Sequence, residues 1–219
     1  MWATLVNGMR TVIDSLYALT GTIGIPSYAL AIILLTIIIK MALYPLSKKQ
    51  MVSMKMMQEL APKIKQIQDK YKNKDPQKMQ QKVMELYREH NVNPMSGCLP
   101  ILVQMPILIA LYRALLDYDF INKQDAYLFG IYLAEKDPTF ILAILAAVST
   151  FIQSKLTSNT QDQTQKTMLY MMPLFIGWIA ATVPAGLALY WVVFNIVGTL
   201  QQYYINRQVL ATDKEVAKQ

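Results

Sequence analysis

The sequence predicts an all-α, polytopic membrane protein with five transmembrane helices, an N-terminal interfacial amphipathic helix and a cytoplasmic helical hairpin. Of its 219 residues, 54% are hydrophobic and only 16% are charged, whereas soluble domains contain about 25% charged residues. Charged residues are absent from four long runs, and the last, broken midway by Val183-Pro-Ala-Gly186, is long enough for two spans. These runs cover residues 15–39, 91–112, 138–154 and 167–206.

The distribution of lysine and arginine predicts which way the helices cross the membrane. If five helices alternate, sixteen basic residues fall on the side of the segment that follows the first span, and four fall on the opposite side. Basic residues concentrate in cytoplasmic loops, so the N-terminus is expected outside and the C-terminus in the cytoplasm. The net charge of +7 suits an anionic membrane surface or ribosomal RNA and does not distinguish the two.

The N-terminal segment, residues 1–22, is expected to form an amphipathic helix on the outer membrane surface. An apolar stripe at helical spacing runs from Trp2 to Tyr17, with Arg10 and Asp14 on the opposite face. No cleavable signal is recognisable in this segment. Since a first span with its N-terminus outside usually needs help to insert, an upstream leader is expected to be missing.

The first transmembrane helix is predicted over residues 23–46, and it carries Lys40 at membrane depth. A lysine at the centre of a membrane helix costs about 2.5–3.5 kcal/mol. Thr36, Lys40 and Tyr44 are spaced by four residues and form one polar stripe. Two interpretations stay open: the long side chain snorkels to the nearby lysine-rich end of the helix, or it faces a water-filled cavity.

Residues 47–92 are predicted to form a helical hairpin in the cytoplasm. An apolar seam with alternating spacings of three and four residues runs from Met57 to Tyr71. A turn at Lys72-Asn-Lys-Asp-Pro76 precedes a second apolar stripe, which begins at Met79. The two stripes are expected to pack against each other and to leave a lysine-rich tip exposed.

The second to fifth transmembrane helices are predicted within residues 93–205, and residues 206–219 are expected to form a basic, disordered cytoplasmic tail. Three of the spans have room for only about 16–18 apolar residues, which corresponds to about 24–27 Å. This length is shorter than an ordinary hydrocarbon core, so local thinning of the bilayer is expected.

Amide side chains also occur at membrane depth in the later spans. Gln104 lies in the second span, Gln153 in the third, and Asn195 lies one helical turn from Trp191 in the fifth. Such amides often hydrogen-bond between helices and only hold them together. The alternative is a wet cavity, open to the cytoplasm, that Lys40 shares with Gln153 and Asn195, because no acidic residue is available at that depth to pair with the lysine.

The sequence gives no sign of catalytic chemistry. No Walker-type loop, dinucleotide fingerprint, nucleophile–base pair or metal-ligand cluster is present, so neither enzyme activity nor a cofactor or metal is expected. The single cysteine, Cys98, offers no disulfide framework, and the single histidine, His90, ends a hairpin helix. A secondary transporter would be expected to show inverted repeats or charged relays, and neither is visible.

Five motifs occur in order along nearly the whole chain. The most specific is the run Asn-Pro-x-x-Gly-Cys-x-Pro-x-x-x-Gln-x-Pro over residues 93–106. The others are Tyr44-Pro-Leu46, Pro62-Lys-Ile64, Glu135-Lys-Asp-Pro138 and Leu189-Tyr-Trp191. Together they resemble the YidC-type membrane protein insertases. The resemblance implies a five-helix core with a hydrophilic groove that is open to cytoplasm and lipid and closed outside. It also implies the short, Gram-positive-like form, since no large extracytoplasmic domain is seen.

The resemblance further implies a function in the bacterial cell membrane. Newly made membrane proteins are expected to pass hydrophilic segments through the groove and to release their spans into the lipid bilayer. The groove residues expected on this basis are Thr36, Lys40, Tyr44, Gln104, Gln153, Trp191 and Asn195. The residues of the hairpin expected to receive substrate are Met54, Met57, Leu60, Ile64, Lys72 and Lys74. A ribosome, bound through the hairpin and tail, and the Sec translocon are further candidate partners.

One position departs from the family pattern, and two other classes of function stay open. The family usually has an arginine in the groove where this chain has Lys40, which keeps the charge but loses the planar pair of donors that grips a carboxylate. An ion or small-solute channel would line a through-pore with the same polar residues. A passive assembly scaffold would leave Lys40 dispensable.

Overall fold

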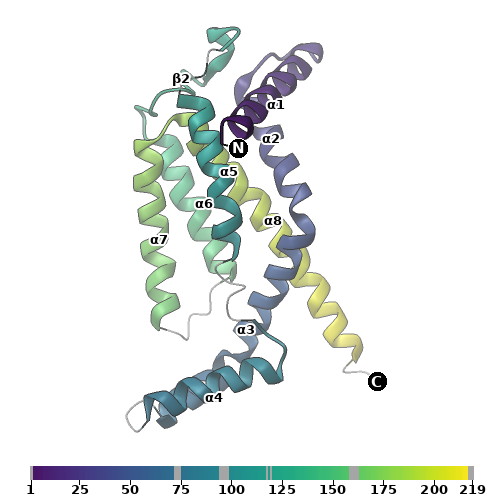
Figure 1. The fold of residues 1–219 in the computed structure, drawn as a ribbon, viewed down its shortest axis with the longest axis vertical. Coiled ribbons are helices and arrows are strands. Elements are labelled where there is room, and N and C mark those ends of the chain that lie inside the picture. Colours follow the sequence, from purple (N-terminus) through teal and green to yellow (C-terminus); the bar gives the residue numbers. More distant parts are fainter. Residues whose placement is uncertain are drawn as a thin grey trace.

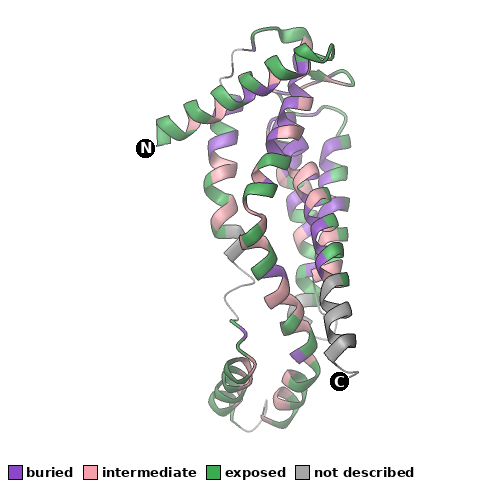
Figure 2. Ribbon diagram, turned by 90° about the vertical axis from the view of Figure 1, so that its right-hand side faces the viewer, coloured by how far each residue is buried: buried purple, intermediate pink, exposed green. Residues whose placement is uncertain are grey.

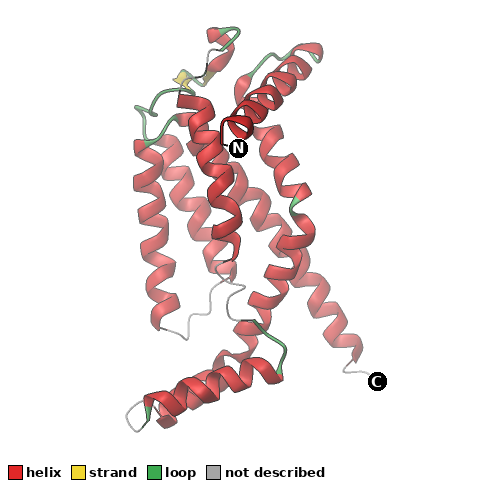
Figure 3. Cartoon of the chain, viewed as in Figure 1, coloured by secondary structure: helices red, strands yellow, loops and turns green. Residues whose placement is uncertain are grey.

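The structure is a computed structural model that describes residues 2–71, 75–93, 99–116, 118, 120–157 and 163–216. The predicted helical class is confirmed, with one very short strand pair in addition (Figure 3). The helices are α1 (Trp2–Thr22), α2 (Tyr28–Ala42), α3 (Tyr44–Tyr71), α4 (Pro76–Glu89), α5 (Leu99–Leu116), α6 (Ile141–Thr157), α7 (Gln163–Thr182) and α8 (Ala185–Val216). The connection between α5 and α6 contains the 3₁₀ helix η2 (Lys123–Ala126) and the strands β1 (Tyr127–Leu128) and β2 (Ile131–Tyr132).

Most of the helices lie side by side as a bundle, and the others extend from its two ends (Figure 1). The bundle consists of α2, α5, α6, α7 and α8, in which α6 packs against α7 and α8, and α2 packs against α8. Helix α1 lies across one end, called here the α1 end. Helices α3 and α4 form a hairpin at the opposite end, called here the hairpin end.

The apolar core occupies the α1 end of the bundle. Its largest side chains with almost no exposure include Tyr28 and Ile32 of α2, Leu111 and Leu115 of α5, and Tyr190 of α8. All lie in the part of their helix nearest α1, and burial is concentrated within the bundle, whereas the hairpin is mostly exposed (Figure 2). Close packing of such side chains determines how neighbouring helices fit together, so this end gives the bundle its shape.

The loop before α6 fastens the start of α8. The backbone N–H of Ala185 donates to the carbonyl of Glu135 over 2.7 Å, and that of Gly186 donates to Leu133 over 2.9 Å. The first N–H groups of a helix have no acceptor within the helix, and here carbonyl groups of the loop accept their hydrogen bonds. Glycine suits this close approach, because a Cβ at residue 186 would lie only 3.2 Å from the Leu133 carbonyl oxygen.

Asp137 caps the start of α6 from the same loop. Its carboxylate accepts hydrogen bonds from the backbone N–H groups of Thr139 and Leu142, both over 2.8 Å, and from the Thr139 hydroxyl over 2.6 Å. Burial raises the pKa of this carboxyl, but the hydrogen bonds to its charged form outweigh burial, and the pKa lies below its usual value. Asp137 is 2% exposed.

The chain bends by 67° between α2 and α3. Helix α2 begins at an N-cap, Ser27, whose hydroxyl accepts from the N–H of Leu30. It ends at Ala42, and the next residue, Leu43, lies at the bend with φ −84° and ψ 0°. Pro45 has no N–H to continue the helical ladder and its ring crowds the preceding turn, which explains a break here. The bend therefore lies a few residues before the predicted end of the first span at residue 46.

Length and apolarity together identify few candidates for membrane spans. Within the described residues, no single helix meets both requirements, but α2 and α3 meet them jointly across their bend. Two further helical stretches, Leu102–Leu116 and Ile141–Thr157, are apolar but shorter. The expectation of a disordered tail from residue 206 is wrong for most of that segment, because α8 continues as a helix to Val216. The polar composition that suggested disorder is also compatible with an exposed helix.

Candidate functional site

A cavity of about 220 Å³ with both polar and apolar lining residues, called here the polar cavity after its lysine and amide side chains, lies at the hairpin end of the bundle. Helices α2, α3, α5, α6 and α8 all contribute to its wall, so residues far apart in the sequence meet there. Three of the predicted groove residues line it, namely Lys40, Gln104 and Gln153. The polar residues that join them are Ser47, Gln50, Ser154, Thr157 and Gln202.

Lys40 places a cation in this cavity without a neutralising carboxylate. The residue is 4% exposed, and its Nζ lies 3.4 Å from the centroid of the Phe194 ring. Such a contact over an aromatic face stabilises a cation by its attraction to the ring electrons. Within the described ranges, the ion pairs join Lys55 to Glu59 and Lys82 to Glu85, and neither involves Lys40.

The amides around Lys40 are only partly satisfied. Gln104 donates through Nε2 to the Tyr190 hydroxyl over 2.7 Å, and Gln201 donates to the backbone carbonyl of Lys40 over 3.5 Å. In contrast, Gln50 Nε2, Gln201 Oε1 and Gln202 Oε1 are buried and have no hydrogen-bond partner among the described residues. Buried polar atoms are costly without partners. The cavity therefore favours an occupant with its own polar groups, such as water or a hydrophilic peptide.

Two of the predicted groove residues are used for packing between or within helices instead. The amide nitrogen of Asn195 donates to the hydroxyl oxygens of Ser149 and Thr150 over 3.1 and 2.7 Å, so it joins α8 to α6. Thr36 is fully buried and donates to the carbonyl of Ile32 over 2.7 Å, one turn earlier in α2. Neither side chain lines the polar cavity.

The remaining two predicted groove residues also lie elsewhere. Tyr44 is half-buried at the start of α3 and is not part of the cavity wall. Trp191 lines a separate apolar pocket of about 210 Å³ between α5, α7 and α8. Its neighbours there include Tyr112 of α5 and Ile179 of α7. An indole in such surroundings suits contact with apolar side chains or lipid more than with a hydrophilic segment.

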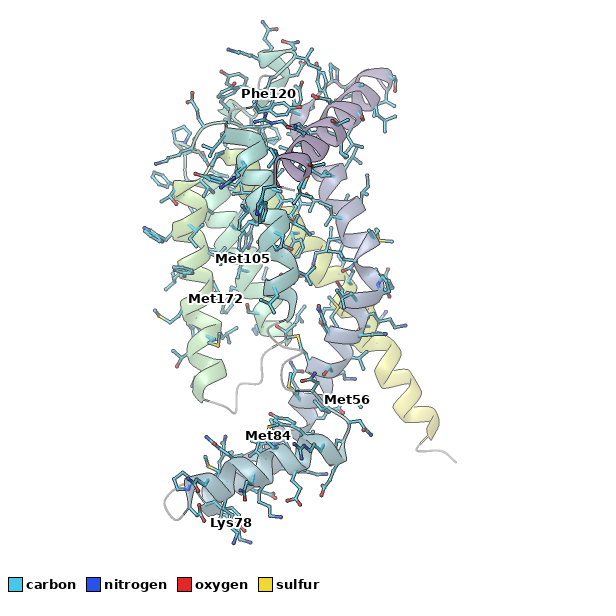
Figure 4. The ribbon with its side chains drawn as sticks, viewed as in Figure 1. Met56, Lys78, Met84, Met105, Phe120 and Met172 are labelled. Carbon is cyan, nitrogen blue, oxygen red and sulfur yellow. The ribbon has the colours of Figure 1, made fainter. Side chains whose placement is uncertain are left out.

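The predicted receiving residues of the hairpin divide into three groups. Met54 lines the polar cavity. Met57, Leu60 and Ile64 are buried or half-buried along the seam of α3, where it packs on α4. Lys72 and Lys74 lie outside the described residues. Hairpin methionines that are exposed include Met56 and Met84, each at 43% exposure (Figure 4).

Side chains from four segments pack together at the α1 end, opposite the cavity. Tyr17 of α1 stacks on Tyr28 of α2 with ring centroids 4.1 Å apart, and Tyr28 meets Phe120 edge-on at 4.6 Å. The Tyr118 hydroxyl donates to Asp14, and Tyr17 donates to Asp125 over 2.5 Å. The bond to Asp125 raises the pKa of Tyr17 to about 12. These contacts bind α1 to the loop beyond α5 and, with the apolar core, fill this end of the bundle.

Comparison with known proteins identifies the family. A family model described as "60Kd inner membrane protein" matches residues 18–213. The chain belongs to this family. The resemblance seen in the motifs is thereby confirmed, and the bacterial inner membrane is the location that this family indicates.

Relatives in the 60Kd inner membrane protein family are similar over most of this chain. A "Membrane protein insertase YidC" of Wolinella succinogenes is 43% identical over 206 residues, which cover 94% of this chain and 37% of that protein. A "Membrane protein insertase YidC 1" of Listeria monocytogenes is 45% identical over 186 residues, covering 82% of this chain and 64% of that protein. The chain thus spans between about a third and two thirds of the length of these relatives.

A solved structure in this family has the same fold. The chain matches "Active YidC insertase crystal structure with the first transmembrane domain resolved" with a TM-score of 0.70 and 29% identity. The match covers 93% of this chain and 47% of that chain. The helical fold that contains the polar cavity is therefore shared with that structure.

Sequence reasoning missed several residues of the cavity. Gln50 and Gln202 lie at helix positions where an isolated glutamine is not unusual, and Phe194 looks like any apolar residue of a span. A signal was available in α8, because Phe194, Gly198 and Gln202 are spaced by four residues and so share one face. This face, and not the neighbouring face that carries Trp191 and Asn195, contributes Phe194 and Gln202 to the wall of the cavity.

Proposed function

We propose that this protein is a membrane protein insertase that moves hydrophilic segments of newly made membrane proteins partway across the bilayer. The observation that carries the proposal is a buried lysine, with no ion pair among the described residues, in a polar cavity at one end of a bundle whose other end is packed with apolar side chains. Relatives named as membrane protein insertases, 43–45% identical to this chain, support the same conclusion.

The cavity would act by lowering the barrier to crossing. In hydrocarbon, each charge or unpaired backbone group of a substrate costs several kcal/mol. A segment in the cavity meets two lining amides with atoms unpaired among the described residues, at Gln50 and Gln202, which offer hydrogen bonds in place of water. Lys40 attracts acidic residues of that segment. Burial of the substrate's own apolar span in lipid, worth about 0.8 kcal/mol for each CH₂ group, then drives release, so no nucleotide is required.

Thinning of the bilayer would shorten the rest of the path. Helix α6 has 17 residues and is about 26 Å long, less than the roughly 30 Å of a hydrocarbon core. A bilayer adapts to short helices by becoming locally thinner. The segment leaving the cavity would therefore face less hydrocarbon between Lys40 and the α1 end than it would in undisturbed lipid.

The proposed topology has five spans, α2, α5, α6, α7 and α8, with the N-terminus outside and the C-terminus in the cytoplasm. Large apolar side chains on the outer faces of α6 and α7 support it, since they are exposed in the isolated chain and would contact lipid. They include Ile144, Val148, Met171, Leu174 and Trp178. The basic residues of the hairpin support the sidedness.

Single cysteines test this topology in a variant whose natural Cys98 has been replaced. Cysteine at Asn122, in the loop before η2, is expected to react with an impermeant thiol reagent only from outside the cell. Cysteine at Gln80, on the exposed face of α4, is expected to react only after the membrane is opened. Reaction of both sites from the same side would contradict the five-span arrangement.

The hairpin is proposed to receive substrate or a partner such as a ribosome, and the Sec translocon is a candidate second partner. Its basic surface and its exposed Met56 and Met84 suit a contact that is both electrostatic and deformable. Replacing residues 57–89 by a short flexible linker should leave the bundle folded and reduce insertion. Insertion at the full rate would remove the hairpin from the mechanism.

Reconstitution tests the function itself. The purified protein in vesicles is expected to insert a short single-span substrate without nucleotide, and protein-free vesicles and vesicles with the Lys40→Met variant serve as controls. The conductance of the same protein in a planar bilayer is expected to stay at background. Steady ion conductance without insertion would contradict the insertase and favour a channel.

A further inference from the structure

Gly198 of α8 lies where the ends of two cavity side chains meet. A Cβ added at this position would be 2.9 Å from Lys40 Nζ and 2.7 Å from Gln153 Nε2. Both distances are shorter than real contacts of a Cβ atom allow. Lys40 comes from α2 and Gln153 from α6, so α8 receives both side chains at its one glycine in this part of the helix.

The crowding at Gly198 differs in kind from that at other helical glycines. Gly8 and Gly21 of α1 have open space where a Cβ would be. A Cβ at Gly177 or Gly186 would meet mainly alkyl groups and backbone carbonyls of neighbouring elements. At Gly198 the nearest atoms are a cationic group and an amide, both at the far ends of flexible side chains. A methyl group there would move these polar ends without forcing the backbone apart.

Together with its neighbours on α8, Gly198 forms the place where the Lys40 ammonium group packs, called here the seat. Phe194, one turn before Gly198, presents its ring to Lys40 Nζ at 3.4 Å, and Gln202, one turn after, lines the same cavity. Glycine is a poor helix former compared with alanine. Its presence at the centre of a helix, with a charge packed directly on the backbone, indicates that space for Lys40 is what the position supplies.

We propose that Gly198 is a positioning residue that holds the Lys40 ammonium group against α8, over Phe194 and beside Gln153, where it faces an acidic segment in the cavity. The proposal rests on the insertase function proposed above. It assigns to α8 a part in setting where the positive charge lies, in addition to forming the wall. A side chain at residue 198 displaces the charge, and the preference for acidic substrates declines with it.

The position of the ammonium group can be measured without any substrate. A small water-soluble acetylating reagent, applied to the protein in lipid nanodiscs, modifies lysines at rates that mass spectrometry reports for each peptide. In Gly198→Ala, Lys40 is expected to react several-fold faster than in the wild type, because its amine is displaced from the seat. Exposed Lys78 is the internal reference, and Gly8→Ala is the control for the same substitution in open space. Equal Lys40 rates in Gly198→Ala and Gly8→Ala would overturn the proposal.

Insertion assays then connect position to function. Gly198→Ala is expected to insert an acidic-tailed substrate several-fold more slowly, to insert its neutralised counterpart at the wild-type rate, and to cause no further loss when Lys40 is already methionine. Equal loss for both substrates would show general damage to packing and would overturn the proposal, as would unchanged insertion despite a displaced amine. If the wild type inserts neither substrate, the proposed function fails, and the modification rates still decide whether Gly198 seats Lys40.

Discussion

The two ends of the bundle are built from the same helices but are filled in opposite ways. At the α1 end, Tyr28, Ile32, Leu115 and Tyr190 are almost fully buried in an apolar core. At the hairpin end, the space is a cavity with a cation and two amide atoms, Gln50 Nε2 and Gln202 Oε1, that have no hydrogen-bond partner among the described residues. The difference shows that each helix has a structural half and a polar half, and that stability and function are separated along its length.

The largest expected effect comes from removing an aromatic side chain at the α1 end. Tyr28→Ala deletes a ring that packs on Tyr17 and Phe120, and a hydroxyl that accepts from the N–H of Ile121 over 3.0 Å. Loss of a buried aromatic ring costs about 3–5 kcal/mol of unfolding free energy. The matched change at the other end is Val103→Ala, which shortens a half-buried side chain of the cavity wall and is expected to cost much less.

Unfolding of both variants in the same lipid bicelles, followed by circular dichroism, measures this contrast. The insertion rate of the Val103 variant should stay near that of the wild type. Similar losses of stability in the two variants would show that the ends of the bundle do not differ in the way described.

The next effect concerns Lys40 and should appear in insertion without a loss of stability. Lys40→Met removes a buried charge, so the protein is expected to be at least as stable. For an acidic-tailed substrate, the lost electrostatic attraction should raise the barrier to insertion by about 1–2 kcal/mol, for an effective dielectric near 20 at separations beyond contact. The insertion rate should then fall about 5- to 30-fold. Lys40→Arg keeps the charge and adds a planar pair of donors, so insertion should be retained or improved.

Paired substrates make the Lys40 experiment specific. The same single-span protein is used with an acidic tail and with that tail neutralised, and only the acidic form should depend on residue 40. Normal insertion of the acidic form by Lys40→Met would mean that the lysine merely snorkels to the hairpin end.

A smaller effect is expected at Asp137, which belongs to the α1 end. Removing this cap with Asp137→Ala should cost about 0.5–2 kcal/mol at neutral pH. Because the carboxyl has a lowered pKa in the folded protein, its contribution is complete above the unfolded pKa of about 3.9 and is lost as the pH falls through the folded value. Asp137→Asn should keep most of the cap and remove this pH dependence. Unfolding measured from about pH 6, where the contribution is complete, down to about pH 2, toward the lowered folded pKa, gives the result.

The smallest effect is expected on the hairpin surface. Lys82 and Glu85 form an ion pair over 2.5 Å, but both side chains are about half exposed. Exposed pairs contribute little because water and salt screen them. Lys82→Gln should therefore leave the thermal unfolding midpoint unchanged within error. A clear shift of the midpoint would show that the hairpin surface contributes to stability as the packed α1 end does.

Local patterns in the sequence predicted the helices well. The spacing of Met57, Leu60 and Ile64 predicted the inner face of α3, and in the structure these residues are buried or half-buried. The stripe starting at Met79 behaves in the same way on α4. Helical periodicity is visible within one segment of about two turns, so it requires no knowledge of what the helix packs against.

The site could be predicted only in part because a cavity is made by several helices at once. Lys40, Gln104 and Gln153 attract notice as polar residues in apolar runs, and they do meet in the cavity. Asn195 attracts notice for the same reason, yet its amide is occupied by Ser149 and Thr150. Spacing shows which residues share a face, but which neighbour that face meets depends on long-range packing. The aromatic contacts at the α1 end join four separate segments and had no local signal.

Helix α3 connects the wall of the cavity to the hairpin, so a movement of one can be transmitted to the other. This helix has 28 residues and contains Pro62. It begins immediately after the bend at Leu43, runs away from the bundle and then turns to lie along α4 (Figure 1). Its first part, residues 44–61, is about 27 Å long. Gln50, in the cavity wall, lies only about 9 Å along it from that bend. A rotation of this first part about Leu43 that moves Gln50 by about 1 Å moves residue 61 by about 3 Å. A partner that binds the hairpin can therefore change the width of the cavity by moving the first part of α3.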